Sequence, residues 1–256
     1  MLDFNNLLFL LLVGLGAMVQ TLTGFAMGLI IMGGVTALGL ASISDTAAVV
    51  SLVSLLNTAV ALRRCYQFID YSYVISLACA MLPALLLGVF MMSYLAEVYV
   101  DGLRMLLGLV IVTAGTLLML TPKPYATASG GLKKALAGVA GGLMGGMYGA
   151  AGAPLAYLMY RQPLAVNIVR ASLLGLFAMS TLVRTVVVGA AGQINHNVVS
   201  LSVLAMPLVV IVTLGTVRIS HRIPDALVRR CAFVLLIVLG LFLMSGSSRF
   251  QVFLHP

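Results

Sequence analysis

Charge is scarce in this chain. Only 8% of its 256 residues are Asp, Glu, Lys or Arg, and 62% are apolar, with a mean hydropathy of +1.18. A soluble domain carries about a quarter charged residues, so a water-soluble protein is excluded. Apolar runs of about 17 to 25 residues are long enough to cross a bilayer core about 30 Å thick. The sequence consists almost wholly of such runs, which predicts an all-α polytopic membrane protein.

Groups that catalysis or metal binding would need are also few. Cys65, Cys79 and Cys231 match neither a metal-ligand spacing nor a disulfide framework, so we interpret them as packing residues. No Asp or Glu lies in the middle of an apolar segment, and no carboxylate relay for protons is visible. The basic residues form no continuous face for nucleic acid. We therefore expect no enzyme, no metal, no cofactor and no nucleic-acid partner.

Eight apolar segments are separated by short polar loops. They cover residues 5–42, 46–62, 72–95, 102–120, 135–160, 167–190, 197–217 and 227–245. The first is too long for one crossing, and the first and fifth are interrupted, at Gln20 to Gly24 and at Gly145 to Pro154. Non-helical backbone at membrane depth leaves polar groups unpaired unless protein, water or a ligand satisfies them. The interruptions therefore need a structural or functional reason.

The two halves of the chain resemble each other at an offset of 124 or 125 residues. Glycines, prolines and aspartates align in the same order, Gly24 with Gly149, Pro83 with Pro207, and Asp101 with Asp225. We therefore predict two repeats, residues 1–122 and 131–256, joined by the loop 123–130 within a single membrane domain. Each repeat would hold a broken helical hairpin followed by three membrane-spanning helices, and many transporters are built on such internal repeats.

The positions of the basic residues predict the topology, because cytoplasmic loops collect Lys and Arg. If all eight segments cross the membrane, the 14 basic residues split evenly between its two sides. If the first and fifth segments instead fold back as re-entrant elements, all of them except Arg104, Arg184 and Arg249 share one side. This uneven split predicts two inverted repeats with both termini outside. We expect a bacterial cytoplasmic (inner) membrane, in which the termini are periplasmic.

The two interruptions predict a site for a small oxyanion. Converging half-helix ends present free backbone N–H groups and a partial positive charge, and glycine lets a ligand approach the backbone closely. The candidate residues from the two interruptions are Gln20, Thr23, Gly24, Gly149, Gly152 and Pro154. The alternative is that the glycines only allow close helix packing, which suits the run from Gly138 to Gly142 best.

Three further side chains could add to this site. Arg170 and Arg184 lie 14 positions apart in the sequence, about 21 Å along a helix, so only one of them easily reaches the midplane. Either could hold an anion, or could extend to the membrane interface, which is the favoured position for Arg184. Asn57 could donate hydrogen bonds to an oxyanion or form an interhelical hydrogen bond.

Four stretches of the sequence resemble the sulfite exporter TauE/SafE family of membrane transporters. They are residues 24–29 (GFAMGL), Leu55 to Asn57 ahead of Arg63 and Arg64, residues 147–155 (MYGAAGAPL) and residues 170–173 (RASL). The duplicated halves fit this family too, so the likeness spans nearly the whole chain. The resemblance implies transport of sulfur-containing anions such as sulfite or organosulfonates, and it carries over as binding residues Asn57, Gly149, Gly152, Pro154 and Arg170.

We therefore expect a secondary transporter, with export as the direction, that exposes an anion site alternately to the two sides of the membrane. A channel-like anion pore would use the same groups with weaker binding and is the alternative. An intramembrane enzyme or an assembly subunit would need a catalytic cluster or large exposed loops, which the sequence lacks. The expected partners are a small anionic substrate and the lipid bilayer. The sequence leaves open the coupling ion, the sulfur anion that is carried and whether protomers pair as a homodimer.

Overall fold

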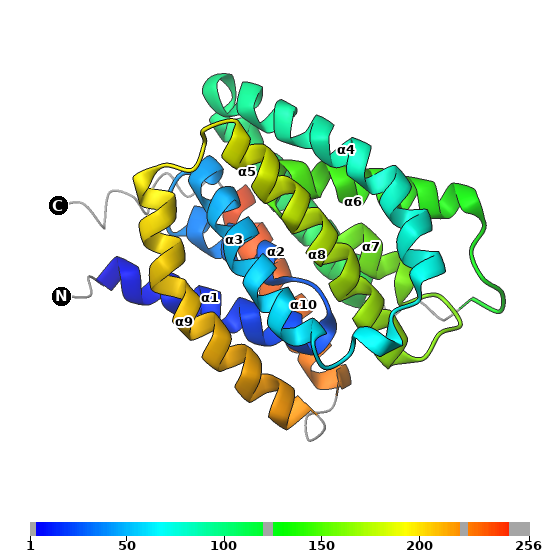
Figure 1. Cartoon of the computed structure of the whole chain (residues 1–256). Coiled ribbons are helices and arrows are strands. Elements are labelled where there is room, and N and C mark those ends of the chain that lie inside the picture. Colours follow the sequence, from blue (N-terminus) through cyan, green and yellow to red (C-terminus); the bar gives the residue numbers. More distant parts are fainter. Residues whose placement is uncertain (1–3, 120–124, 221–224, 246–256) are drawn as a thin grey trace.

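The structure, a computed structural model, describes residues 4–119, 125–220 and 225–245. Within these ranges the chain is all-helical, as predicted (Figure 1). The first half holds α1 (Phe4–Thr23), α2 (Met27–Ala37), α3 (Ile43–Leu62), the short 3-10 helix η1 (Tyr66–Phe68), α4 (Tyr71–Val98) and α5 (Val100–Met119). The second half holds α6 (Gly131–Tyr148), α7 (Gly152–Met159), α8 (Val166–Ala190), α9 (His196–Ile219) and α10 (Asp225–Met244).

The first and fifth apolar segments are each broken into two helices that fold back on one another. A Cβ built on Gly16 of α1 would lie 3.1 Å from the side chain of Met27, at the start of α2, and one on Gly34, near the end of α2, would touch Leu12 of α1. α2 therefore runs back along α1, and α7 likewise returns along α6. The two helix breaks expected from the sequence are confirmed, but they are shorter, at residues 24–26 and 149–151, because Gln20 to Thr23 still belong to α1 and Gly145 to Tyr148 to α6.

Six helices in the described part of the chain are long and apolar enough to cross a membrane, namely α1, α3, α4, α5, α8 and α9. The sequence also predicted six crossings, but it counted the last apolar segment as a crossing and the first as a re-entrant element. α1 is one of the six because it runs for 20 apolar-rich residues before the break. α2 and the part of α10 whose side chains the structure describes, Arg230–Met244, are shorter apolar helices.

Polar side chains fix where three of the helices begin. Ser42, Asp70 and Asn195 each accept a hydrogen bond from a backbone N–H in the first turn of α3, α4 and α9, at 3.0, 3.1 and 2.9 Å. Such a cap typically contributes about 1 kcal/mol. Asn195 also donates from Nδ2 to Oδ1 of Asp45 at 2.7 Å, which ties the loop before α9 to the start of α3.

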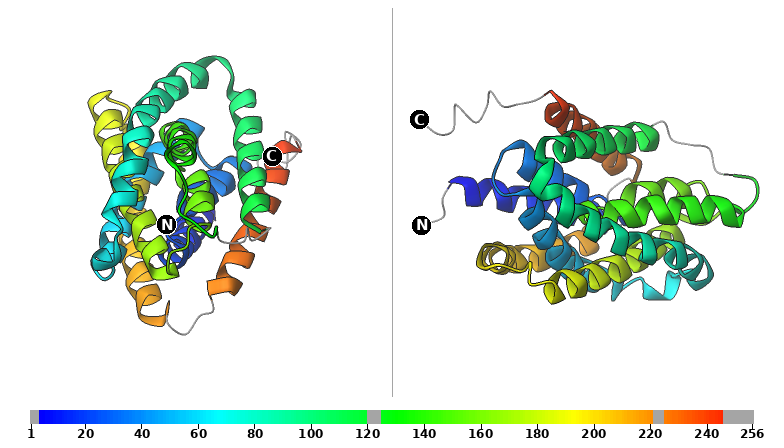
Figure 2. Two further views of the ribbon diagram at one scale, coloured as in Figure 1. Left: turned by 90° about the vertical axis from the view of Figure 1, so that its right-hand side faces the viewer. Right: turned by 90° about the horizontal axis from the view of Figure 1, so that it is seen from above.

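Glycines allow the helices of the two halves to pack closely. A Cβ on Gly138 of α6 would lie 2.8 Å from the carbonyl oxygen of Leu77 in α4, and Gly142 meets α4 in the same way one turn later. The left view of Figure 2 shows α4 and α5 arching over α6. A Cβ on Gly108 of α5 would lie 3.0 Å from the carbonyl oxygen of Gly240 in α10. The packing interpretation of the glycine run in α6 is therefore confirmed.

The helix contacts follow a common order in the two halves. α1 packs on α9 as α6 packs on α4, and α2 packs on α3 and α10 as α7 packs on α8 and α5. α3 also contacts α8, and α5 contacts α10. Exchanging the first five helices with the last five thus leaves these pairings unchanged.

Side-chain contacts join the ends of α4, α6, α7 and α8 at one end of the bundle, at the lower right in Figure 1. The N–H of Asp70, before α4, donates to Oγ of Ser172 in α8 at 2.9 Å. The hydroxyl of Tyr73 donates to Oε1 of Gln162, which follows α7, at 2.9 Å, and Nζ of Lys134 in α6 lies 3.8 Å from the centroid of the Tyr73 ring.

Most of the basic residues that the structure describes lie at this end, which we call the basic end. It holds Arg63, Arg64, Lys133, Lys134, Arg161, Arg170, Arg218 and Arg230. Arg104, near the start of α5, lies at the other end. Lys123, Arg222 and Arg249 lie outside the described residues. That the basic end faces the cytoplasm stays a prediction from the charge distribution.

Candidate functional site

The two helix breaks touch each other inside the bundle. Gly24 and Gly149 adopt φ values of 82° and 66°, a region that suits glycine because it has no Cβ. A Cβ built on Gly28, in the first turn of α2, would lie 2.6 Å from the carbonyl oxygen of Gly149. One on Gly152 would lie 3.0 Å from Cβ of the buried Phe25. The breaks fit together because these glycines leave room for the opposite backbone.

The first break also holds a strained residue. Ala26 precedes α2 with a φ of 84°, and a non-glycine residue in this region is strained by about 1–3 kcal/mol. Hydrogen bonds hold the surrounding backbone, since Oγ1 of Thr23 lies 2.8 Å from the carbonyl oxygen of Val19 and 3.0 Å from that of Phe25. The hydroxyl of Tyr160 donates to the carbonyl oxygen of Thr23 at 2.6 Å. Thr23, predicted as a binding residue, therefore shapes the break itself.

Gln20 and Asn57 belong to one buried polar cluster between α1, α3 and α9. Nε2 of Gln20 donates to Oγ1 of Thr58 at 3.1 Å. Nδ2 of Asn57 donates to Oγ1 of Thr21 at 3.1 Å and to Oγ1 of Thr213 at 2.7 Å. Both amide side chains are fully buried. The interhelical hydrogen bonds left open as the alternative role of Asn57 are therefore present.

The amide oxygens of Gln20 and Asn57, unlike their amide nitrogens, lack hydrogen bonds within the described residues. Oε1 of Gln20 and Oδ1 of Asn57 have no hydrogen-bond partner among the described residues. An amide oxygen accepts hydrogen bonds and cannot donate them, so these atoms suit a proton donor or a cation. An oxyanion bound beside Gln20 and Asn57 would need hydrogen-bond donors from other residues.

Arg170 provides such donors in a cavity of about 220 Å³ at the basic end. Its guanidinium donates to the carbonyl oxygen of Thr21, near the end of α1. Besides Arg170, the polar lining of the cavity comes from Thr21, Arg64, Cys65, Asn167 and Ser220. None of the described lining residues carries a carboxylate. Two guanidinium groups with amide, hydroxyl and thiol neighbours create a positive potential that favours a small anion.

Cys65 is a half-buried part of this cavity wall rather than only a packing residue. Burial raises the pKa of its thiol, and the positive charge of Arg170 lowers that pKa by a smaller amount. The thiol is therefore neutral at neutral pH. Its position beside Arg170 makes it a natural chemical reporter of the cavity.

Arg184 lies deep inside the bundle, with 4% of its surface exposed. Nε donates to the carbonyl oxygen of Gly146 at 2.9 Å, and Nη1 donates to the carbonyl oxygen of Ala47 and to Oγ of Ser51, both at 2.6 Å. Gly146 belongs to the last turn of α6, where a cation offsets the negative end of the helix dipole. The interfacial position favoured for Arg184 was wrong, because these acceptors satisfy the guanidinium inside the protein.

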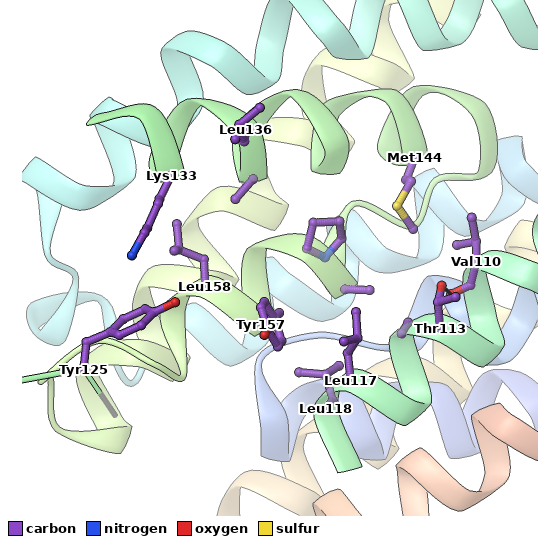
Figure 3. Close-up of a pocket in the computed structure, with 14 residues that line it drawn as sticks. Val110, Thr113, Leu117, Leu118, Tyr125, Lys133, Leu136, Met144, Tyr157 and Leu158 are labelled. Atoms are coloured by element: carbon purple, nitrogen blue, oxygen red, sulfur yellow. Dashed lines mark hydrogen bonds between the residues drawn. The ribbon is translucent and has the colours of Figure 1, made fainter. Parts of the chain in front are cut away.

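Pro154 faces a different hollow, an apolar cleft between α5, α6 and α7 (Figure 3). The predicted residues thus fall into three groups. Near the end of α1 lie Gln20, Thr23, Gly24, Asn57 and Arg170; at the second break lie Gly149, Gly152 and Arg184; and at the apolar cleft lies Pro154.

The sequence prediction missed several residues of the Arg170 cavity. Arg64, two residues after the end of α3, was considered only for the topology. Asn167 lies three positions before Arg170 in α8, a spacing that places two side chains on one helix face, and this signal could have been used. Ser220, at the end of α9, carried no comparable signal, because only the tertiary packing brings it to the cavity.

A bundle of long apolar helices, with two broken elements that meet inside it and an arginine-lined cavity at one end, has the features of a multi-pass membrane transporter. The family model described as sulfite exporter TauE/SafE matches residues 8–243, and the chain belongs to this family of transporters. A protein of Cupriavidus necator described as a probable sulfite/organosulfonate exporter TauE is 40% identical to it over 233 residues, 91% of either chain. No solved structure matches the chain.

Proposed function

We propose that this protein is a secondary transporter that exports a small sulfur-containing anion, sulfite or an organosulfonate, across the cytoplasmic membrane. The description of the Cupriavidus necator relative names this substrate class. The observation that carries the proposal is the cavity between Arg64 and Arg170 at the basic end. If the basic end faces the cytoplasm, as the charge distribution predicts, an exported anion enters there.

The size and chemistry of the cavity fit a small oxyanion. Its volume of about 220 Å³ is below the roughly 300–1,000 Å³ typical of sites for larger ligands. Arginine presents several N–H donors in a planar fork that matches the oxygen atoms of an oxyanion. Asn167 and Ser220 add neutral groups to the wall. A sulfite or sulfonate group can therefore exchange its water shell for these donors.

Alternating access would use the two halves of the chain. The exchange symmetry of the helix contacts supports two repeats. Three crossings in each half, by α3 to α5 and by α8 to α10, would make the repeats inverted. The breaks in contact at Gly28 and Gly149 lie where the halves meet. A second polar cavity, of about 360 Å³, lies at the opposite end between the starts of α3 and α9, with Asp45 and Asn197 in its lining. Rocking of the halves would open the path first from one cavity and then from the other.

Flux of labelled sulfite and of labelled sulfoacetate into proteoliposomes tests the proposal. We expect saturable flux for wild type, a loss of at least about tenfold for Arg170→Ala, and a smaller loss for Arg170→Lys, which keeps the charge but not the planar fork. Arg104→Ala is the matched control, because Arg104 is partly exposed at the other end and its ion pair with Asp101, at 3.9 Å, is a surface contact. Absence of flux for both substrates with folded wild type would refute the proposal.

The same liposomes separate a transporter from the channel-like pore. Unlabelled substrate on the far side of the membrane speeds entry of labelled substrate through a transporter, since the loaded site returns faster than the empty one. A pore has no such exchange, and its flux keeps rising with concentration. Accelerated exchange therefore supports alternating access, and flux without saturation or exchange supports the pore.

A further inference from the structure

An apolar cleft of about 430 Å³ lies between α5, α6 and α7 (Figure 3). Its volume is within the roughly 300–1,000 Å³ range of ligand sites. Aliphatic side chains line most of it, including Val110, Leu117, Leu136, Met144 and Leu158. Leu117 and Leu136 are 46% and 62% exposed on the outer surface of the bundle. In a membrane this surface faces hydrocarbon, so the cleft is open to lipid.

Cations and aromatic rings gather at one end of the cleft, which is at the basic end of the bundle. Figure 3 shows the side chain of Lys133 directed toward the ring of Tyr125, and Nζ lies 4.5 Å from the ring centroid. The guanidinium carbon of Arg161 lies 4.5 Å from the centroid of the same ring, and its Nη1 donates to the hydroxyl of Tyr157 at 2.7 Å. Among the residues that the structure describes, no carboxylate lies within ion-pair distance of Lys133 or Arg161.

The cleft is apolar along its walls and carries positive charge and tyrosine rings at one end, which we call its mouth. This arrangement is complementary to an amphiphile with an anionic head. Tyrosine and basic side chains commonly lie at the level of the lipid headgroups. Basic pockets between membrane helices on the cytoplasmic side bind anionic headgroups. A small, fully hydrated anion would gain nothing from the aliphatic walls, because they offer it no hydrogen bonds.

We propose that the cleft binds an anionic phospholipid, with one acyl chain between α5 and α6 and the phosphate at Lys133 and Arg161. Ala153 and Pro154 of α7 belong to the cleft wall. The acyl chain therefore touches the half-helix that follows the second break, and no residue of α7 lines the Arg170 cavity. Bound lipid would hold α7 against α5 and α6 and would stabilise this arrangement of the break.

Native mass spectrometry of the purified full chain, with added phosphatidylglycerol or phosphatidylcholine, tests the proposal. Wild type is expected to retain one phosphatidylglycerol in preference to phosphatidylcholine. Lys133→Ala and Arg161→Ala should each weaken this retention about fivefold, from the typical contribution of one basic side chain at a membrane surface. Lys134→Ala is the matched control, because Lys134 is the next residue on α6 but stacks on Tyr73 and should change nothing.

A second variant tests the apolar part of the site without touching its charge. Ala137→Phe adds a ring to the cleft wall and should reduce phosphatidylglycerol retention while leaving the mouth intact. Equal retention of both lipids by wild type, or an equal loss in Lys133→Ala and Lys134→Ala, would overturn the proposal. Displacement of bound phosphatidylglycerol by sulfite or sulfoacetate would also overturn it, since the cleft would then belong to the substrate path.

Discussion

The contact between the two helix breaks can be tested by adding a single methyl group. In Gly28→Ala the new Cβ would lie 2.6 Å from the carbonyl oxygen of Gly149 and 3.1 Å from Cα of Ala150. Restoring an ordinary contact of 3.4 Å requires the two backbones to separate by about 0.8 Å. Overpacking of this kind in a close-packed interior typically costs about 1–3 kcal/mol. We therefore expect Gly28→Ala to be destabilised by that amount.

Thermal unfolding in detergent, followed by far-ultraviolet circular dichroism, measures this effect. For a chain of this size, 1–3 kcal/mol corresponds to a melting temperature lowered by roughly 2–12 °C. Gly215→Ala makes the same chemical change inside α9, where a Cβ meets nothing within 4 Å, and should leave the melting temperature unchanged or slightly raised. If both variants melt at the wild-type temperature, the breaks are not in contact and the reasoning fails.

Three further outcomes follow from buried or perturbed groups. Arg184→Met leaves the carbonyl oxygens of Gly146 and Ala47 without their buried donor and should lower the free energy of unfolding by about 1–3 kcal/mol. Arg104→Met should change it by less than about 1 kcal/mol, and thermal unfolding compares the two variants. Gln162→Leu removes four hydrogen bonds around a buried amide and should cost about 1–3 kcal/mol in the same assay. Maleimide labelling of Cys65 follows its thiolate, so the rate should still rise with pH where a free thiol, with a pKa of about 8.5, has levelled off. Arg170→Ala should shift that profile to still higher pH, because it removes the charge that lowers the pKa, and an unchanged profile would contradict this placement.

The helical elements and their breaks could be predicted from the sequence because they depend on local chemistry. Apolar runs predict the helices, and the glycines at Gly24 and Gly149 predict the breaks, since both positions adopt a positive φ. The glycine run in α6 predicts close packing through four-residue spacing. These signals lie within a few neighbouring residues, and no knowledge of the tertiary structure is needed to use them.

The site was harder to predict, because its residues meet only through tertiary packing. Asn57 is a hydrogen-bond donor in isolation, but the fold places Thr21 and Thr213 where they accept from its amide. From the sequence, Arg184 is expected at the membrane interface, whereas in the fold α3 and α6 supply buried acceptors for its guanidinium. The sequence contains the residue types of the site, whereas the direction in which each side chain points follows from packing that no local pattern encodes.

Protection of Cys65 from labelling tests the central claim most directly, namely that a sulfonate or related anion binds between Arg64 and Arg170. Cys79 and Cys231 are exposed and are replaced by alanine to leave Cys65 as the single thiol. We predict that sulfoacetate slows maleimide labelling in a saturable way, that chloride at the same ionic strength does not, and that Arg170→Ala abolishes the protection. A protein that transports the anion while Cys65 reacts equally fast with and without sulfoacetate would contradict the account.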